Sequence, residues 1–197
     1  MVPIVDGRTL GCWWGPNAHG ARPRTLPVRG VVWHHTGGEG EAEKVAAVLR
    51  ERGLSIHYVI DADGRTVQMA DPSDTVCYHA GSRANAQFVG VEIVNRGVAP
   101  SLPKRNRAEV DATVRGRKVH ALAFADAQLA SVAALADQLS STYGIPKLTP
   151  NGTDTFKPAD LAKFRGHLEH LHVSDRKVDC CGQIIAHLRR HWGANGS

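Results

Sequence analysis

The sequence predicts an α/β protein in which helices flank a mixed central β-sheet. Short apolar runs typical of buried strands alternate along the chain with segments of helical periodicity. Two of the runs, HYVI and RTVQMA, are separated by a turn at Asp63-Gly64, which indicates an antiparallel β-hairpin. The sheet is therefore mixed rather than purely parallel. A length of 197 residues fits one domain, which we place at residues 28–192.

The first half of the chain supplies most of the expected strands. Residues 1–27 are rich in Gly, Pro and Arg without a clear period, and we expect an irregular arm there. The run VRGVVW at 28–33 reads as a buried strand, and apolar spacing predicts a helix over 41–52 with Gly53 as its C-cap. A further apolar run, FVGVEIV at 88–94, predicts another strand.

The second half of the chain supplies the longer helices. One apolar face runs from Asp126 to Tyr143, and Gly144 is well placed to end that helix. A last helix is expected over Gln183 to His191, followed by a short tail at 193–197.

The charge of the chain is concentrated in one stretch. Residues 96–120 hold seven Lys or Arg and two acidic residues, an excess that equals the net charge of +5 of the whole chain. We interpret this stretch as a surface loop or insertion, either simply solvated or in contact with a polyanion. It contains no aromatic residue to stack on bases, so no nucleic-acid partner is expected.

Composition excludes several other classes of protein. No apolar run approaches the roughly 18 residues needed to cross a bilayer, so no stable membrane association is expected. The N-terminus has no basic stretch followed by an apolar one, and we expect no conventional secretory signal. The four cysteines lack C-x-x-C spacing, which favours free thiols in a reducing compartment. We expect a monomer.

Histidines carry the clearest chemical signal. His34 and His35 follow the strand at 28–33, and adjacent residues on a strand point to opposite faces, so one of them faces any given site. Residues 166–182, GHLEHLHVSDRKVDCCG, gather three histidines, two aspartates and two cysteines. Catalytic zinc sites use three ligands of these types and leave a fourth position for water. We therefore expect a metal site formed by this tract and a strand-end histidine.

Glu92 is an acidic residue inside the apolar run FVGVEIV. A carboxylate is costly to bury without a partner. Beside a metal-bound water it would have a role as general base, whereas on an edge strand it would simply point to solvent.

Five motifs in order extend this interpretation to a known family. They are WHHTGG, SIHYVIDADGRTVQ, YHAGS, FVGVEIVN and the pair FRGH and RKVD. Together they resemble the zinc-dependent N-acetylmuramoyl-L-alanine amidases of type 2, which are related to T7 lysozyme and to animal peptidoglycan recognition proteins. The resemblance runs from about Val28 to Gly182.

The resemblance implies a role for particular residues. Zinc would be bound by His34, by His167 as the histidine that follows a glycine, and by Asp179 as the acidic residue two positions after a lysine. Glu92 would be the base for water, and Lys177 would stabilise the developing oxyanion. His79, in the His-Ala-Gly motif, would line the substrate cleft.

Three departures from the family pattern leave some assignments open. The spacing from His167 to the third ligand is 12 residues, longer than usual, so His170 or His172 could be the second ligand instead. Cys180 adjoins Asp179, and some relatives use cysteine there. One branch of the family has a catalytic tyrosine where this chain has Ile56, and Tyr58 lies two positions further on.

The implied activity is hydrolysis of the amide that joins N-acetylmuramic acid to L-alanine in peptidoglycan. A phage or prophage endolysin, held in the host cytoplasm until it is released to the wall, is the setting we expect. A wall-recycling amidase and a non-catalytic peptidoglycan receptor of the same fold are the competing hypotheses.

Overall fold

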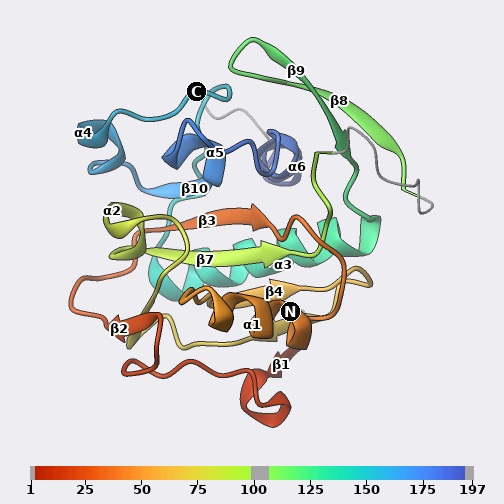
Figure 1. Ribbon diagram of the computed structural model, residues 1–197. Coiled ribbons are helices and arrows are strands. Elements are labelled where there is room, and N and C mark those ends of the chain that lie inside the picture. Colours follow the sequence, from red (N-terminus) through yellow and green to blue (C-terminus); the bar gives the residue numbers. More distant parts are fainter. Residues whose placement is uncertain (1–2, 99–106, 194–197) are drawn as a thin grey trace.

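The computed structural model describes residues 3–98 and 107–193 and is built on a six-stranded mixed sheet (Figure 1). All neighbouring strands run parallel except β4 and β5, which form the antiparallel hairpin expected from the Asp63-Gly64 turn. In spatial order the strands are β1 (Ile4–Asp6), β5 (Thr66–Gln68), β4 (Tyr58–Ile60), β7 (Phe88–Ile93), β3 (Gly30–His35) and β10 (Gly166–Glu169). The predicted fold class is confirmed.

Helices cover both faces of the sheet. Helices α3 (Asp126–Tyr143) and α6 (Gln183–His191) have the bounds that their apolar periodicity predicts, and they pack together over one face. The other face carries α1 (Ala42–Glu51) against β4, and α5 (His170–Val173) against β3 and β10 (Figure 1). The short helices α2 (Ser82–Asn85) and α4 (Pro158–Leu161) complete this side.

Alternation along the two central strands decides which side chains reach which face. In β3, Val31 and Trp33 join the apolar cluster beneath α3, whereas Val32 lies in the cluster on the opposite side. His34 therefore points away from α3. Glu92 on β7 is its Cα partner, so both side chains lie on one face at the carboxyl ends of adjacent parallel strands.

The N-terminal arm is more ordered than the sequence suggests. Its first residues form β1 at the edge of the main sheet, followed by the 3-10 helix η1 (Gly7–Leu10). Strand β2 (Ala21–Pro23) pairs antiparallel with β6 (Thr75–Cys77) in a separate small sheet. The arm is therefore attached by backbone pairing to segments far along the chain, which local periodicity does not reveal.

The second half of the basic stretch lies in a hairpin at the upper edge of the molecule in Figure 1. Strands β8 (Glu109–Val114) and β9 (Arg117–Leu122) pair antiparallel through a two-residue turn. The rest of this stretch, at 99–106, and the tail beyond residue 193 lie outside the described residues.

Candidate active site

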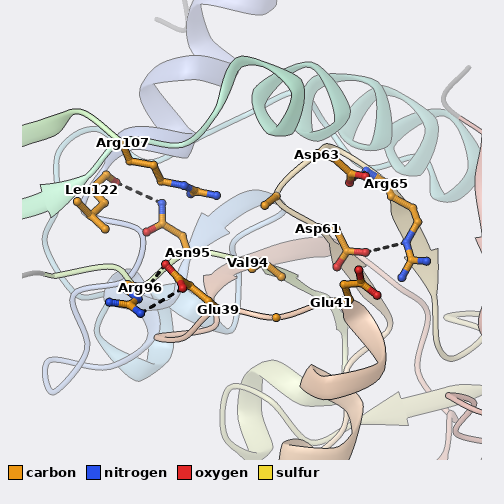
Figure 2. Close-up of a pocket in the computed structure, with 12 residues that line it drawn as sticks. Glu39, Glu41, Asp61, Asp63, Arg65, Val94, Asn95, Arg96, Arg107 and Leu122 are labelled. Carbon is orange, nitrogen blue, oxygen red and sulfur yellow. Dashed lines mark hydrogen bonds and ion pairs between the residues drawn. The ribbon is translucent and has the colours of Figure 1, made fainter. Parts of the chain in front are cut away.

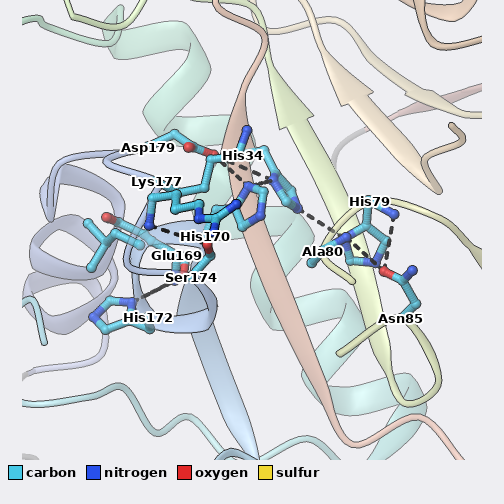
Figure 3. Close-up of polar contacts among 12 residues, drawn as sticks. His34, His79, Ala80, Asn85, Glu169, His170, His172, Ser174, Lys177 and Asp179 are labelled. Atoms are coloured by element: carbon cyan, nitrogen blue, oxygen red, sulfur yellow. Dashed lines mark hydrogen bonds and ion pairs between the residues drawn. The ribbon is translucent and has the colours of Figure 1, made fainter. Parts of the chain in front are cut away.

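His34, His170 and Asp179 converge at the end of β3 (Figure 3). The Nδ1 atoms of the two histidines are 2.9 Å apart. Oδ2 of Asp179 lies 3.1 Å from Nδ1 of His170 and 3.5 Å from Nδ1 of His34. All three residues are buried. Three ligand atoms of the types that zinc prefers therefore share one buried point.

The protonation states of this cluster suit a divalent cation. Burial, followed by the neighbouring His170, lowers the pKa of His34 to about 4, so its ring is neutral at pH 7. Burial alone would raise the pKa of Asp179, but its hydrogen bonds with His170 and His34 outweigh that effect and lower it. A neutral imidazole can offer its lone pair to a metal, and an ionised carboxylate supplies charge. The residues present thus fit a zinc ion.

His167 does not join this cluster, although the sequence motif predicts a ligand there. It pairs in register with Val31 and therefore points to the α3 face, opposite to His34. Its Nε2 is 3.0 Å from Oγ of Ser140, and its ring stacks at 6.1 Å on that of Trp33. The side chain is fully buried in the core. His170, three residues later and at the start of α5, takes the place expected for His167.

His172 and Cys180 also lie away from the cluster. His172 is held by backbone groups: its Nδ1 accepts from the Glu169 N–H at 3.0 Å, and its Nε2 lies 3.1 Å from the Gly152 carbonyl oxygen. Cys180 is fully buried in the core beneath α3 and α6. Asp179, not Cys180, faces the two histidines.

His79 lies directly behind His34. Its Nδ1 is 3.0 Å from Nε2 of His34, the ring nitrogen that faces away from the cluster, and its own Nε2 is 3.4 Å from the Phe88 carbonyl oxygen. Asn85, which the sequence motifs do not single out, accepts hydrogen bonds from the backbone N–H groups of His79 and Ala80 at 3.1 and 2.7 Å. This chain of contacts fixes the orientation of the His34 ring. His79 is also half-buried and lines a surface pocket.

Glu92 lines a cavity of about 360 Å³ between the end of β7 and helix α1. Its Oε2 is buried and has no hydrogen-bond partner among residues 3–98 and 107–193. Burial, and then the negative charge of Asp179, raise the pKa of Glu92 to about 8, against the opposing charges of Lys177 and Arg52. A carboxyl group that exchanges its proton near neutral pH, beside a candidate metal centre, is suited to general acid–base work.

Lys177 and Tyr58 differ in their access to this region. Lys177 is exposed on the loop between His170 and Asp179, and its positive charge lowers the pKa of both His34 and Glu92. Tyr58 is buried in the apolar cluster on the α3 face, while Ile56 packs on the opposite face. Two residues apart on one strand, these side chains would lie on the same face. Ile56 precedes β4, which begins at Tyr58, and the two side chains lie on opposite faces. Tyr58 therefore cannot act at the cluster.

Figure 2 shows a larger cavity of about 510 Å³ with many charged side chains. Several of these charges neutralise one another: Arg65 pairs with Asp61 at 2.7 Å, and Arg96 with Glu39 at 2.9 Å. None of the three cluster residues lines it, and it meets the cavity of Glu92 only at Glu39 and the adjacent loop. The three cluster residues do not line the Glu92 cavity either, and Glu92 is the acid–base candidate that does.

The comparisons with known proteins show the family to which the chain belongs. Residues 24–195 match the Amidase_2 family model, described as N-acetylmuramoyl-L-alanine amidase. This match spans most of the chain, which therefore belongs to that family. It is a peptidoglycan amidase, and the predicted activity is confirmed at this level. No curated protein sequence matches the chain.

Three solved structures illustrate the shared fold. The amidase AmiD of E. coli, in complex with anhydro-N-acetylmuramic acid-L-Ala-D-γ-Glu-L-Lys, is 21% identical with a TM-score of 0.58 over 85% of this chain and 59% of that one. The amidase LysC of Clostridium intestinale is 17% identical with a TM-score of 0.59 over 99% and 100%. The Ph2119 endolysin, from a Thermus scotoductus bacteriophage, is 16% identical with a TM-score of 0.57 over 96% and 98%.

The helices add one negative finding. Within residues 3–98 and 107–193, no helix has both the length and the apolar character that crossing a bilayer requires.

Proposed function

We propose that the chain hydrolyses the amide between N-acetylmuramic acid and L-alanine with a zinc ion held by His34, His170 and Asp179, and that it serves as a phage or prophage endolysin. The observation that carries the proposal is the convergence of these three candidate ligands on the same sheet face as the carboxylate of Glu92, whose buried Oε2 has no hydrogen-bond partner among the described residues. Zinc bound there would polarise the substrate carbonyl and make water more acidic.

Glu92 is the general base and acid of the proposed reaction. No residue in the described part of the chain hydrogen-bonds its Oε2, so this oxygen is free to accept a proton from the attacking water and to deliver it to the leaving amine. The positive charge of a bound metal would lower its pKa from about 8 and so increase the ionised fraction at neutral pH. Lys177 is exposed at the same region and would stabilise the oxyanion of the tetrahedral intermediate.

His79 and Asn85 support the first ligand from behind. If Nδ1 of His34 faces the metal, its Nε2–H donates to Nδ1 of His79, whose own Nε2–H points to the Phe88 carbonyl. Such outer contacts fix the tautomer of a metal-binding histidine. His79 also reaches the surface pocket, so contact with the glycan–peptide substrate remains part of the proposal.

A non-catalytic receptor is the weaker hypothesis. Loss of catalysis in such a fold would be expected to remove a ligand or the base, whereas this chain has three converging ligands and a carboxylate with a raised pKa. The likeness to the Ph2119 endolysin, over 96% of this chain and 98% of that one, supports the endolysin setting, and AmpD matches over a similar share, 95% and 98%. A recycling amidase is the competing setting.

Two substrates distinguish these settings. The purified protein is offered intact sacculi in one assay and a soluble anhydro-muropeptide in another, each with zinc present. An endolysin solubilises sacculi and releases stem peptides from them. Turnover of the soluble fragment with no action on sacculi would contradict the endolysin proposal and favour recycling. Binding of sacculi without cleavage of either substrate would favour the receptor.

A further inference from the structure

The turn of the β8–β9 hairpin contains an arginine in a backbone conformation that arginine rarely adopts. Arg115 has φ of +48° and is followed by Gly116 with φ of +75°. Two-residue hairpin turns of this type favour Asn-Gly or Asp-Gly, because both positions need positive φ. An arginine at this position therefore calls for an explanation from the contacts of its side chain, which is longer than that of asparagine.

Arg115 binds the loop that carries the candidate ligands. Its Nη2 donates to the carbonyl oxygens of Lys177 at 2.8 Å and Asp175 at 3.0 Å. Its Nη1 donates to the carbonyl oxygen of Leu171 at 3.1 Å and to Oγ1 of Thr155 at 3.3 Å. One guanidinium group thus holds three carbonyl groups of the segment 171–177.

The hairpin backbone and its apolar side chains reinforce this attachment. The Arg115 N–H donates to Oγ1 of Thr153 at 2.9 Å. Val114 and Ala121 of the hairpin form one apolar cluster with Leu171 and Cys181, on either side of the loop. The hairpin therefore contacts the loop through Arg115 at its tip and through the apolar side chains of its strands.

The position of this loop gives the contacts a consequence for the site. Segment 171–177 joins His170 to Asp179, and it includes Lys177 itself. Asp179 must stay within 3.1 Å of His170 for the ligand atoms to share one point. Within the segment itself, the Leu171 N–H donates to the Asp179 carbonyl oxygen at 3.1 Å, and the Arg115 guanidinium adds donors for three other carbonyl groups.

We infer that the β8–β9 hairpin is a brace for the ligand loop, and that Arg115 is a positioning residue for Asp179 and Lys177. This inference rests on the proposed function, in which these two residues bind zinc and stabilise the oxyanion. It also gives the basic stretch a role within the molecule: one of its arginines donates hydrogen bonds to loop carbonyls instead of binding a polyanion.

The test uses Arg115→Asn, because asparagine tolerates positive φ and keeps the turn while removing the guanidinium group. Arg117→Asn is the matched control, since Arg117 lies at the same hairpin tip and is exposed. Hydrogen exchange of residues 171–179 is measured on the metal-free proteins, and zinc affinity is measured by competition with a chelating dye. The exchange of helix α3 reports on global stability.

Arg115→Asn should speed exchange in segment 171–179 by about 10-fold or more and weaken zinc binding by about 10–100-fold, the size expected for a group that supports a ligand. Exchange in α3 should not change, and Arg117→Asn should resemble the parent. Unchanged loop exchange, unchanged zinc affinity, or equal loss of protection in α3 would each overturn the inference. If the parent protein binds no zinc, the proposed function fails, and loop exchange alone decides whether the brace exists.

Discussion

Replacing His170 and His167 separately with alanine distinguishes the ligand from the core residue. In the structure, His170 offers one of the three candidate ligand atoms, whereas His167 faces Ser140 and Trp33 on the other side of the sheet. Structural zinc sites of four ligands bind with about 10–16 kcal/mol, or roughly 3–4 kcal/mol for each ligand. His170→Ala should therefore weaken zinc binding by roughly 100- to 1000-fold.

His167→Ala should instead cost stability. It removes one buried hydrogen bond, worth about 1 kcal/mol, and ring contacts with Trp33 and Trp192 worth about 1 kcal/mol each, a loss of roughly 3 kcal/mol. Zinc affinity is measured by competition with a chelating dye, and the free energy of unfolding by urea denaturation. His167→Gln, which can still bond to Ser140, serves if the alanine variant does not fold. Loss of zinc by a folded His167 variant, with zinc retained by His170→Ala, would refute the reasoning.

Three further predictions concern the base, the third ligand and acid stability. Glu92→Gln should keep the fold and the zinc but lose about 10²–10⁴-fold in turnover of peptidoglycan, and near-normal turnover would remove Glu92 from the mechanism. Asp179→Ala should abolish zinc binding and activity, while Cys180→Ser, buried in the core, should keep most of both; the reverse result would assign the ligand to Cys180. Burial, and then the charge of Arg24, lower the pKa of His57 to about 3 in the folded protein, against about 6.5 when unfolded. Its contribution to stability is therefore complete above pH 6.5 and is lost as the pH falls toward 3, with a slope of up to about 1.4 kcal/mol per pH unit. Urea denaturation between pH 7 and pH 4.5 should show a shallower slope for His57→Gln, and an unchanged slope would contradict this assignment.

The fold is predictable from the sequence because its strongest signals are local. The helix from Asp126 to Tyr143 has a continuous apolar face and a glycine at its end, and its observed bounds coincide with the predicted ones. The Asp63-Gly64 turn correctly indicates that the sheet is mixed. The short edge strand Ile4–Asp6 escapes prediction, because its pairing with β5 spans about 60 residues and leaves no periodic trace.

The sequence predicts which residue types form the site, but it does not predict which histidine of the 166–182 tract joins His34 and Asp179. His34 and Asp179 follow from the sequence motifs, and the structure brings both into one cluster. His167 is indicated by the glycine before it, yet its direction is set by pairing with Val31, a long-range contact. The pairing of His167 with Val31 places its side chain on the opposite face from His34, and this is the reason we propose His170 as the ligand.

Two supporting residues have no signal of their own in the sequence. Arg115 is one charge among seven in the basic stretch, and its contacts with the 171–177 loop lie 56 or more positions away along the chain. Glu169 lies within the histidine-rich tract, but its buried carboxylate accepts the N–H groups of Gly182, Ile184 and Ile185 at the start of α6. Their roles depend on tertiary packing rather than on motif or periodicity.

Mass analysis of digested peptidoglycan tests the central claim most directly. Purified sacculi are incubated with the protein as prepared, with the protein after a chelator, and with the chelated protein after zinc is restored. The account predicts free stem peptides beginning with L-alanine and glycan strands that retain intact N-acetylmuramic acid, lost with the chelator and recovered with zinc. Cleavage at another bond, or the same products in full yield after chelation, would contradict it.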